Sequence, residues 1–292
     1  MRMNGCPVSV AEQVLALVKG WAEQTWETGI AFGTVGIARQ GFKLEVTTYR
    51  AESYDPTSRN PVVTYGDTLA GDLSRRDFTV NAMAIALPDW RAPDAFVDLY
   101  GGIEHLAAKV LRTPGTPEAS FGDDPLRMLR AARFAAQLGF TVAPEVVTAM
   151  TAMAERLSIV SVERVREELT RLMLGQAPRA GLELLVDTGL AGAVLPELPA
   201  LQLEIDEHHQ HKDVYEHTLQ VLERAMRLEA DGPDLILRLA AVLHDIGKPP
   251  TRRHQPGGGV SFHHHEVVGA KMARQRMRHL TYGKDVIEPV CR

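Results

Sequence analysis

The sequence predicts an α+β protein in which a small mixed sheet is followed by two all-helical modules. Before residue 100, short runs of alternating apolar and polar residues are typical of strands. After Pro117, long segments with apolar residues at helical spacing take over. The length of 292 residues exceeds that of an ordinary single domain. We therefore expect three domains, over residues 1–115, 116–205 and 206–292.

The first hundred residues are predicted to form one amphipathic helix and three strands. The helix is expected over 10–27, the strands over 30–38, 42–49 and 95–99, and a loop over 51–68. In the second strand, Phe42, Leu44 and Val46 alternate with Lys43, Glu45 and Thr47. Because successive side chains of a strand point to opposite faces, Glu45 should lie on the polar face of a half-buried strand.

The remainder of the chain is predicted to be helical. Four helices, joined by short turns with Gly or Pro, are expected at about 123–139, 144–157, 161–174 and 178–189. A further helical set begins near Asp213 and is the part richest in histidine.

Composition excludes several classes of protein. No apolar run approaches the roughly 18 residues that a membrane span needs, and the first ten residues lack the apolar core of a signal peptide. Cys6 and Cys291 lie at opposite ends, which fits a reducing cytoplasm and argues against a disulfide framework. The net charge is −5, but residues 248–284 hold eight Lys or Arg and one acid, Glu266. Such a stretch is compatible with a polyanionic partner.

In the segment GDLSRRDFTVNAMAIAL, residues 71–87, several charged residues directly precede a run of mainly apolar ones. Arg75 and Arg76 can grip phosphate or ribose oxygens through forked donors. Asp77 can hold one of those forks, and the amide of Asn81 both donates and accepts. The alternative is a charged helix end with a surface ion pair, which an isolated Arg-Arg-Asp would favour.

The segment FGDDPLRMLRAARFAAQLGF, residues 121–140, predicts a capped helix with a charged half. Asp123 or Asp124 caps it, and Pro125 stands in the first turn. Asp124, Arg127, Arg130 and Arg133 share one half of the helix, and the apolar half can pack against the sheet domain. Asp124 and Arg127 are close enough to pair and could read the edge of a base. The alternative is an amphipathic helix with solvated arginines.

Four segments together make a family resemblance. They are RRDFTVNAMA (75–84), DLYGG (98–102), DDPLRMLRAARF (123–134) and SVERVREEL (161–169). In order and spacing they resemble the motifs of bacterial class II tRNA nucleotidyltransferases, which comprise the CCA-adding enzymes and the bacterial poly(A) polymerases. The resemblance covers about residues 10 to 200. It implies a polymerase β-like nucleotidyltransferase head domain, followed by a helical domain that selects nucleotides and binds tRNA.

The resemblance also implies roles for individual residues. Arg75, Arg76, Asp77 and Asn81 would hold the sugar and phosphates of the incoming nucleotide. Asp98, Gly101 and Gly102 resemble a flexible hinge-like element. Asp124 and Arg127 resemble the base-selecting pair, although the family usually has Glu-Asp where this chain has Asp123-Asp124. Arg130 and Arg133 would support the triphosphate, Glu163 and Arg164 would steady the base-reading helix, and Glu45 aligns with the third active-site carboxylate.

The resemblance further implies an Asp-x-Asp pair that holds two Mg²⁺ ions and precedes the segment matching residues 10–27. Ahead of Glu45 the sequence has only the acids Glu12, Glu23 and Glu27. We therefore expect a family member truncated after its catalytic strand, unable by itself to add nucleotides. The whole parent is expected to build tRNA 3′-CCA ends from CTP and ATP.

The histidine-rich end carries a second resemblance. HKDVYEHTL (211–219), AAVLHDIGKP (240–249) and FHHHEVVGA (262–270) resemble the HD phosphohydrolase domain that follows the helical domain of many bacterial CCA-adding enzymes. That resemblance makes His217, His244 and Asp245 metal ligands, with His265 a further candidate beside His263 and His264. Imidazole and carboxylate donors suit Mn, Ni, Fe, Zn or Mg. Asp285 is the nearest candidate for a closing aspartate, so this domain is also expected to be incomplete.

Three functions remain open from the sequence. The first is a tRNA nucleotidyltransferase that uses Mg²⁺, CTP, ATP and the tRNA 3′ end. The second is metal-dependent phosphohydrolysis of RNA-end or nucleotide phosphates, in which Lys248 either neutralises the phosphate or merely caps a helix end. The third is a tRNA- and nucleotide-binding remnant without turnover. None involves a membrane.

Overall fold

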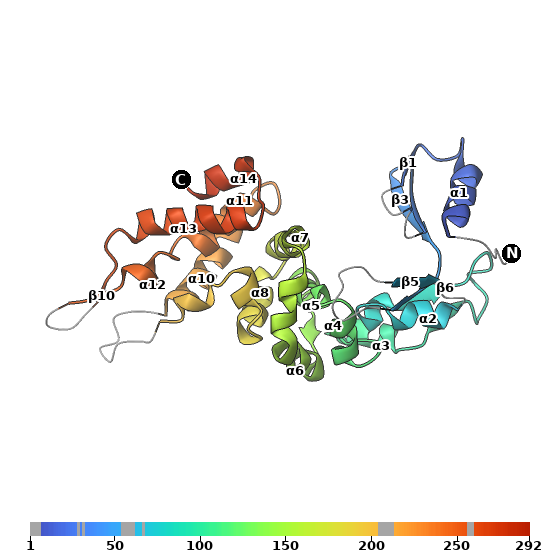
Figure 1. Ribbon diagram of the computed structural model, residues 1–292, viewed down its shortest axis with the longest axis horizontal. Coiled ribbons are helices and arrows are strands. Elements are labelled where there is room, and N and C mark those ends of the chain that lie inside the picture. The colour runs from blue at the N-terminus through green and yellow to red at the C-terminus, as the bar shows by residue number, and fades with distance from the viewer. Residues whose placement is uncertain are drawn as a thin grey trace. The chain divides into compact units, whose positions relative to one another are not determined.

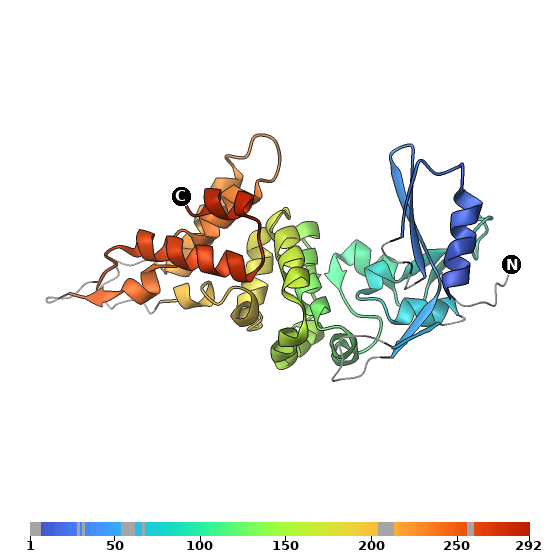
Figure 2. The same ribbon diagram turned by 45° about the horizontal axis from the view of Figure 1, so that its top comes forward.

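The computed structural model describes residues 7–27, 30, 33–53, 62–65, 68–203, 213–255 and 260–292. The chain divides into two compact units. The first unit comprises Met1–Arg76 and Asn81–Tyr100, and the second comprises Asp77–Val80 and Gly101–Arg292. Figures 1 and 2 show the elements of both units from two directions. A mixed sheet region followed by helices confirms the α+β class.

A three-stranded antiparallel sheet with one helix opens the first unit. Helix α1 (Pro7–Val18) precedes β1 (Gln24–Trp26), β2 (Thr34–Arg39) and β3 (Phe42–Thr47), in the order β1-β2-β3. Ala11 of α1 forms a small core with Val35 and Ile37 of β2. Gln40 and Gly41 take positive φ in the turn between β2 and β3, a conformation that hairpin turns require.

Two expectations for this sheet are wrong. The helix predicted over 10–27 ends at Val18, because Gly20 adopts the left-handed backbone (φ 77°) that terminates helices, and β1 follows. Strand β3 is exposed along its whole length, with Phe42 at 73% exposure, instead of half-buried. The reason is that the apolar side chains of α1 cover β2 and not the edge strand β3.

The segment predicted as a loop over 51–68 contains a second hairpin. Strand β4 (Arg50–Ser53) pairs antiparallel with β5 (Val62–Tyr65), and the middle of the predicted loop lies outside the described residues. Helix α2 (Leu69–Ser74) follows, capped by Thr68, whose side chain accepts from the Gly71 N–H. After the 3₁₀ turn η2 (Thr79–Asn81), β6 (Met83–Ile85) pairs with β7 (Phe96–Asp98). The strand predicted over 95–99 is confirmed.

Helices dominate the second unit. Its first part contains α3 (Gly102–Ala108), β8 (Val110–Leu111), α4 (Pro117–Asp123), α5 (Leu126–Leu138), β9 (Thr141–Val142), α6 (Pro144–Met153), η3 (Ala154–Ile159), α7 (Val162–Met173), α8 (Pro178–Asp187), α9 (Ala191–Val194) and η4 (Pro199–Leu201). The four helical segments predicted between 123 and 189 are confirmed. The first begins after an extended residue, Asp124 (φ −140°, ψ 100°), which separates α4 from α5.

Helix α5 lies at the centre of these helices and packs against α7 and α8. Its apolar half therefore contacts helices of its own unit, whereas the sequence suggested the sheet domain. Arg127 and Arg133 are buried, at 8% and 6% exposure, so the alternative with solvated arginines does not hold for them. Such burial requires partners, which are described below.

The histidine-rich end of the second unit consists of α10 (Val214–Met226), α11 (Leu235–Leu243), α12 (Lys248–Thr251), β10 (Arg253–His254), β11 (Val260–Ser261), α13 (His265–His279) and α14 (Lys284–Val290). Its core is continuous with that of the preceding helices. The buried Arg238 of α11 donates to the carbonyl oxygens of Met173 and Gly175, each at 2.7 Å. The last carbonyls of α7 are thereby satisfied by the histidine-rich end.

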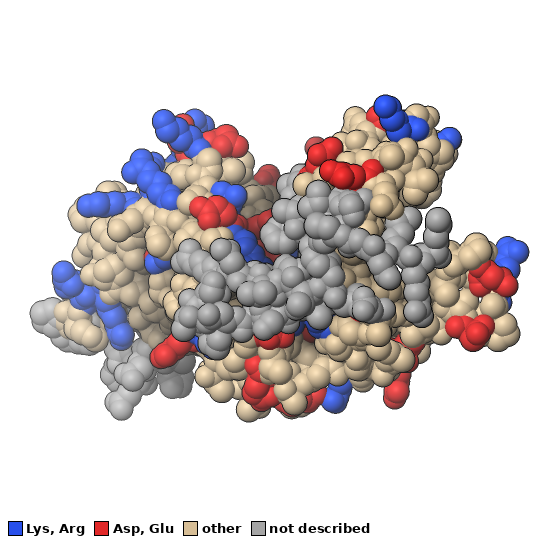
Figure 3. All heavy atoms as spheres, turned by 45° about the vertical axis from the view of Figure 1, so that its right-hand side comes forward, with Lys and Arg blue, Asp and Glu red and all other residues tan. Residues whose placement is uncertain are grey.

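No described helix has the length and apolar character needed to cross a bilayer. Figure 3 shows Lys and Arg side chains interspersed with Asp and Glu on the face that it presents. One sign of charge therefore does not dominate that face.

Candidate nucleotide-binding and metal sites

The twin arginines at the end of α2 are held by an aspartate of the same helix. Arg75 Nη2 lies 2.5 Å from Asp72 Oδ1, and Arg76 Nη2 lies 3.1 Å from Asp72 Oδ2. Arg76 also donates from Nη1 to the carbonyl oxygen of Asn81, at 3.3 Å. Two guanidinium groups, 22% and 41% exposed, are thus held by one carboxylate, an arrangement that suits phosphate oxygens.

Asp72 takes the role that the sequence assigned to Asp77. It is only 2% exposed. Burial alone raises the pKa of this carboxyl, but the hydrogen bonds and positive charges of Arg75 and Arg76 outweigh burial and hold its pKa below the usual value. The signal in the sequence was the helical spacing, because residues three and four positions apart meet on one face of a helix.

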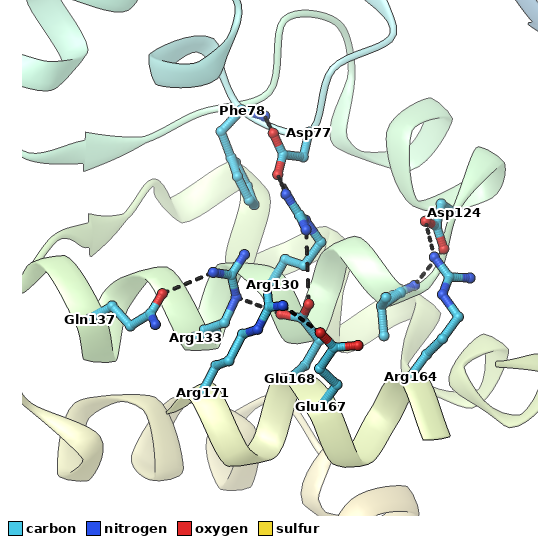
Figure 4. A network of polar contacts seen from close by, with 11 residues as sticks. Asp77, Phe78, Asp124, Arg130, Arg133, Gln137, Arg164, Glu167, Glu168 and Arg171 are labelled. Atoms are coloured by element: carbon cyan, nitrogen blue, oxygen red, sulfur yellow. Dashed lines mark hydrogen bonds and ion pairs between the residues drawn. The ribbon is translucent and has the colours of Figure 1, made fainter. Parts of the chain in front are cut away.

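Asp77 instead anchors α5 within the second unit (Figure 4). Its Oδ2 accepts from Arg130 Nε at 2.8 Å and from Arg130 Nη2, and its Oδ1 accepts from the Phe78 N–H. The ring of Phe78 meets Phe134 edge to face, with ring centroids 5.7 Å apart. Asp77 and Phe78 are therefore tied to α5 through a charged and an aromatic contact.

Glu168 of α7 completes this network and was not singled out from the sequence. It is 5% exposed, and its Oε2 accepts from Arg133 Nε at 2.6 Å, while Oε1 lies 3.8 Å from Arg130 Nη1. Arg133 also donates to Gln137 Oε1 at 2.9 Å and stacks over the ring of Phe134. Burial lowers the pKa of Arg133, opposed by the Glu168 charge. Nothing in the sequence distinguished Glu168 from the solvated acids beside it.

The carboxylate of Asp124 lies at the start of α5. Its Oδ1 accepts from the Leu126 N–H at 3.1 Å, and its Oδ2 accepts from Arg164 Nη2 at 2.8 Å. The ion pair expected between Asp124 and Arg127 is therefore replaced by one with Arg164. Arg127 turns its Nη1 to the backbone oxygen and hydroxyl of Ser120, at 3.3 and 2.9 Å. The N-cap position of α5 is taken by Pro125 and not by Asp123 or Asp124, because Asp124 is extended and forms the C-cap of α4.

The structure thus brings Arg164 to the start of α5. Glu163 stands beside it in the first turn of α7, and Asp123 ends α4. Asp124 retains 21% exposure and Arg164 retains 52%, so this pair faces solvent. An exposed acceptor on a fixed helix start is accessible to a base edge.

The segment resembling a hinge lies where the chain passes from the first unit to the second. Asp98 ends β7 and accepts from the Tyr100 N–H at 3.3 Å, and Gly101 begins the second unit. Gly101 takes a left-handed backbone (φ 69°), which a side chain would strain, and Gly102 begins α3.

Glu45 lies on the exposed edge strand β3, opposite Gly36. Among the described residues, no group of three or more candidate metal ligands surrounds it. Two Mg²⁺ ions need paired carboxylates. The described residues around Glu45 therefore do not fit a polymerase metal site.

A second cluster forms around the buried Asp245. His217, His244 and Asp245 present ligand atoms that all lie within 4.8 Å of one another. The Nε2 atoms of His217 and His244 lie 3.8 and 3.0 Å from Asp245 Oδ2, and His265 Nε2 lies 3.6 Å from Oδ1. Four predicted ligands from three segments therefore converge.

Backbone contacts orient two of these imidazoles. The Nδ1 atoms of His244 and His265 lie 2.8 Å from the carbonyl oxygens of Ala241 and Phe262. An Nδ1–H that donates to a carbonyl leaves the Nε2 lone pair directed at the cluster, as in metal-binding histidines. The donor set therefore fits a divalent metal ion.

The glycine of His-Asp-Ile-Gly-Lys brings α13 to this cluster. A Cβ atom at Gly247 would lie 2.1 Å from the His265 carbonyl oxygen and 2.6 Å from the Gly269 nitrogen. His265 thus reaches Asp245 because Gly247 has no side chain. Asp285 lies in the first turn of α14 and does not belong to the group of candidate ligands among the described residues.

Hydrogen bonds set the charge of the central carboxyl. Burial alone raises the pKa of Asp245, but hydrogen bonds from His244 and Lys248 lower it to about 2. Lys248 Nζ lies 2.6 Å from Asp245 Oδ2. A carboxylate that stays ionised at neutral pH is a competent metal ligand.

Three family models match most of the chain. The poly A polymerase head domain matches residues 7–112, the probable RNA and SrmB-binding site of polymerase A matches 139–201, and the HD domain matches 214–292. The fold and sites thus define a nucleotidyltransferase head joined to an RNA-binding segment and an HD domain.

Curated relatives agree with this class. The CCA-adding enzyme of Levilactobacillus brevis is 44% identical over 59% of this chain and 43% of its own. The A-adding tRNA nucleotidyltransferase of Deinococcus radiodurans is 39% identical over 75% of this chain and 50% of its own. The chain thus spans about half the length of these relatives. The chain belongs to the family of bacterial tRNA nucleotidyltransferases and poly(A) polymerases.

Solved structures show the same fold. The crystal structure of the Bacillus stearothermophilus CCA-adding enzyme in complex with CTP is 27% identical, with a TM-score of 0.61, over 96% of this chain and 56% of that one. Proteins of this family typically use divalent metal ions.

Proposed function

We propose that this chain is the nucleotide- and tRNA-binding part of a template-independent tRNA nucleotidyltransferase. The whole protein would add C and A to tRNA 3′ ends from CTP and ATP, in the cytoplasm where these substrates occur. One observation carries the proposal. Asp124 is held at the start of α5 with its carboxylate partly exposed, and α5 is anchored by the buried pair of Arg133 and Glu168.

The residues divide the work of binding a nucleotide. Arg75 and Arg76, oriented by Asp72, would bind the triphosphate. Asp124 would accept a hydrogen bond from the exocyclic amino group that C and A share. Arg127 would turn from Ser120 to donate to a ring nitrogen. U and G present a carbonyl oxygen at the corresponding position, which a carboxylate repels. Arg164 would keep the Asp124 carboxylate in place.

Nucleotide affinity tests this proposal directly. CTP and ATP should bind the chain more tightly than UTP, and the double variant Asp124→Ala/Arg127→Ala should lose about tenfold or more in affinity. Arg171→Ala is the control, because Arg171 is half-exposed and, within the described part of the chain, forms an ion pair only with Glu167 of its own helix. Equal binding by the double variant, or none by the wild type, would overturn the proposal.

Incorporation of nucleotides tests the metal requirement. The sequence contains no Asp-x-Asp pair. We therefore expect no robust labelling of the tRNA when the purified 292-residue chain is incubated with labelled ATP, Mg²⁺ and tRNA that lacks its terminal A. Robust labelling would mean that other residues of this chain hold the catalytic metal ions.

RNA binding has its own test. Contacts to phosphates release counterions, so affinity for tRNA should fall steeply between low and high salt. An affinity independent of salt would exclude the basic residues of 248–284 as the RNA contact.

A second activity is favoured by the cluster around Asp245. His217, His244, Asp245 and His265 would hold a divalent metal ion, which when bound supplies an activated water for hydrolysis of phosphate esters. Elemental analysis after dialysis and a bis-p-nitrophenyl phosphate assay test this. His244→Ala should lose both the metal and the activity, and a metal-free wild type that equals the variant would end the idea.

A further inference from the structure

The ammonium group of Lys248 contacts Asp245, the carboxylate around which the three histidines converge. The Nζ atom of Lys248 approaches Asp245 Oδ2 to 2.6 Å, closer than the Nε2 atom of His244 at 3.0 Å or that of His217 at 3.8 Å. Asp245 itself is 3% exposed, so its charge must be balanced by protein groups and not by solvent. The ammonium group therefore serves as the cation of this cluster.

A divalent metal ion and an ammonium group compete for such an oxygen. Two positive charges a few ångströms apart repel strongly, and more so where burial lowers the local dielectric. A metal ion bound by Asp245 and the imidazoles would thus require the Lys248 ammonium to leave Oδ2. Because lysine has a long flexible stem, the ammonium can move several ångströms without movement of the backbone.

Among the ion pairs of the described residues, Lys248 has one partner, Asp245. Its Nζ atom also lies 5.9 Å from the centroid of the Phe262 ring. Arg252 and Arg253 follow the same short helix, so the neighbourhood is cationic. An anion is the partner that would stabilise the displaced state.

We propose that Lys248 is an internal counter-cation that couples metal binding to anion binding. In the absence of an anion it holds Asp245 and weakens binding of a divalent metal. When a tetrahedral dianion such as a phosphoryl group is present, the ammonium transfers to that anion and frees Asp245 for the metal. Metal and anion therefore bind cooperatively, and by linkage each raises the affinity for the other by the same factor. This inference rests on the metal site proposed above.

Metal titrations without turnover test the coupling. The metal-stripped chain is titrated with Mn²⁺, with free Mn²⁺ followed by electron paramagnetic resonance, in the presence and absence of sulfate. Sulfate is a tetrahedral dianion that keeps Mn²⁺ in solution. In the wild type, sulfate should tighten Mn²⁺ binding by about tenfold, a typical coupling between two sites.

Three variants separate the explanations. Lys248→Met should bind Mn²⁺ about tenfold more tightly without sulfate and lose most of the sulfate effect. Lys248→Arg, which keeps the charge, should retain weak Mn²⁺ binding and the coupling. Lys271→Met, at an exposed position on α13, should behave as wild type. Direct ligation of sulfate to the metal is the same in all variants, so the difference between them isolates Lys248.

The outcomes distinguish this inference from the metal site itself. If Mn²⁺ binds wild type and Lys248→Met equally, with the same response to sulfate, the metal site stands and the coupling is wrong. If Mn²⁺ binds neither the wild type nor any variant, both the metal site and the coupling are wrong. Far-UV circular dichroism of each variant identifies any loss of fold, and Lys248→Gln then replaces Lys248→Met.

Discussion

At the scale of single residues, buried acids decide where the arginines of this protein point. Asp72 holds the twin arginines of the first unit, and Glu168 holds Arg133 in the second. Neither acid stood out in the sequence, because an acid in a charged run is usually solvated. Their burial, 2% and 5% exposed, is a tertiary property.

Glu168→Gln should destabilise the second unit by about 3 kcal/mol, because it leaves the buried guanidinium of Arg133 without a counter-charge. Urea unfolding followed by far-UV circular dichroism measures this. The neighbouring change Glu167→Gln is the matched control. It breaks a half-exposed pair with Arg171 and should cost less than about 1 kcal/mol. Equal losses of unfolding free energy in the two variants would show that the buried pair stabilises the unit no more than the half-exposed pair does.

Asp72→Asn should lower the stability of the first unit by about 2 kcal/mol at neutral pH, since it removes a charged acceptor from two guanidinium groups. The folded pKa of Asp72 is depressed, so its contribution is present above the unfolded pKa of about 4 and is lost as pH falls through the lower folded pKa. The difference between wild type and variant should therefore shrink below about pH 4.

Tryptophan fluorescence measures this change selectively. All three tryptophans, Trp21, Trp26 and Trp90, belong to the first unit. A stability difference that stayed constant from neutral pH down to the acid range would contradict the assignment of Asp72 as an ionised partner.

At the scale of elements, close approach of helices depends on glycine. A Cβ atom at Gly181 of α8 would lie 2.8 Å from the Ala132 carbonyl oxygen of α5 and 2.9 Å from the Leu172 side chain of α7. Helices α5, α7 and α8 thus meet at Gly181, where α8 has no side chain to keep them apart. Helix α5, which carries Asp124 at its start, depends on this contact for its position.

Gly181→Ala should therefore destabilise the second unit by about 2 kcal/mol, despite the higher helix propensity of alanine, because overpacking forces the helices apart. Gly192→Ala in α9 is the control. Its Cβ atom meets nothing within 4 Å, and its stability should be unchanged or slightly higher. Thermal unfolding of both variants provides the measurement, and a neutral Gly181→Ala would mean that the helices are less tightly packed than described.

At the scale of the whole molecule, the histidine-rich end and the helices before it share one core. Arg238 donates to the carbonyl oxygens of Met173, the last residue of α7, and of Gly175, and it forms a buried ion pair with Glu229. Arg166 of α7 donates in return to the backbone oxygen and hydroxyl of Thr281, at 2.6 and 2.9 Å. We expect these parts to unfold together.

Arg238→Leu should separate them. It removes the guanidinium partner of Glu229 and the donor to two carbonyl groups, at a cost of about 3 kcal/mol or more, concentrated where the two parts meet. Calorimetry should show one helical transition in the wild type and two in the variant. Arg171→Leu, an exposed change on α7, should keep the single transition. A single transition in Arg238→Leu would mean that apolar packing alone couples the two parts.

The prediction from the sequence succeeded where local pattern decides structure. Helical periodicity predicted the segments between 123 and 189. The resemblance to the HD domain pointed to His217, His244, Asp245 and His265, which lie close together in the structure. It failed for the helix expected over 10–27 and for the burial of β3, since both depend on what packs against them.

The sequence by itself determined the order of elements, the family and the types of residue available for binding. Those properties follow from periodicity and from motifs whose chemistry is local. Only the tertiary structure decided which acid pairs with which arginine, that Asp124 faces Arg164, and that Lys248 occupies the carboxylate of Asp245. Pairing of charges depends on distance in space and on burial, and neither is written in the spacing of residues along a chain.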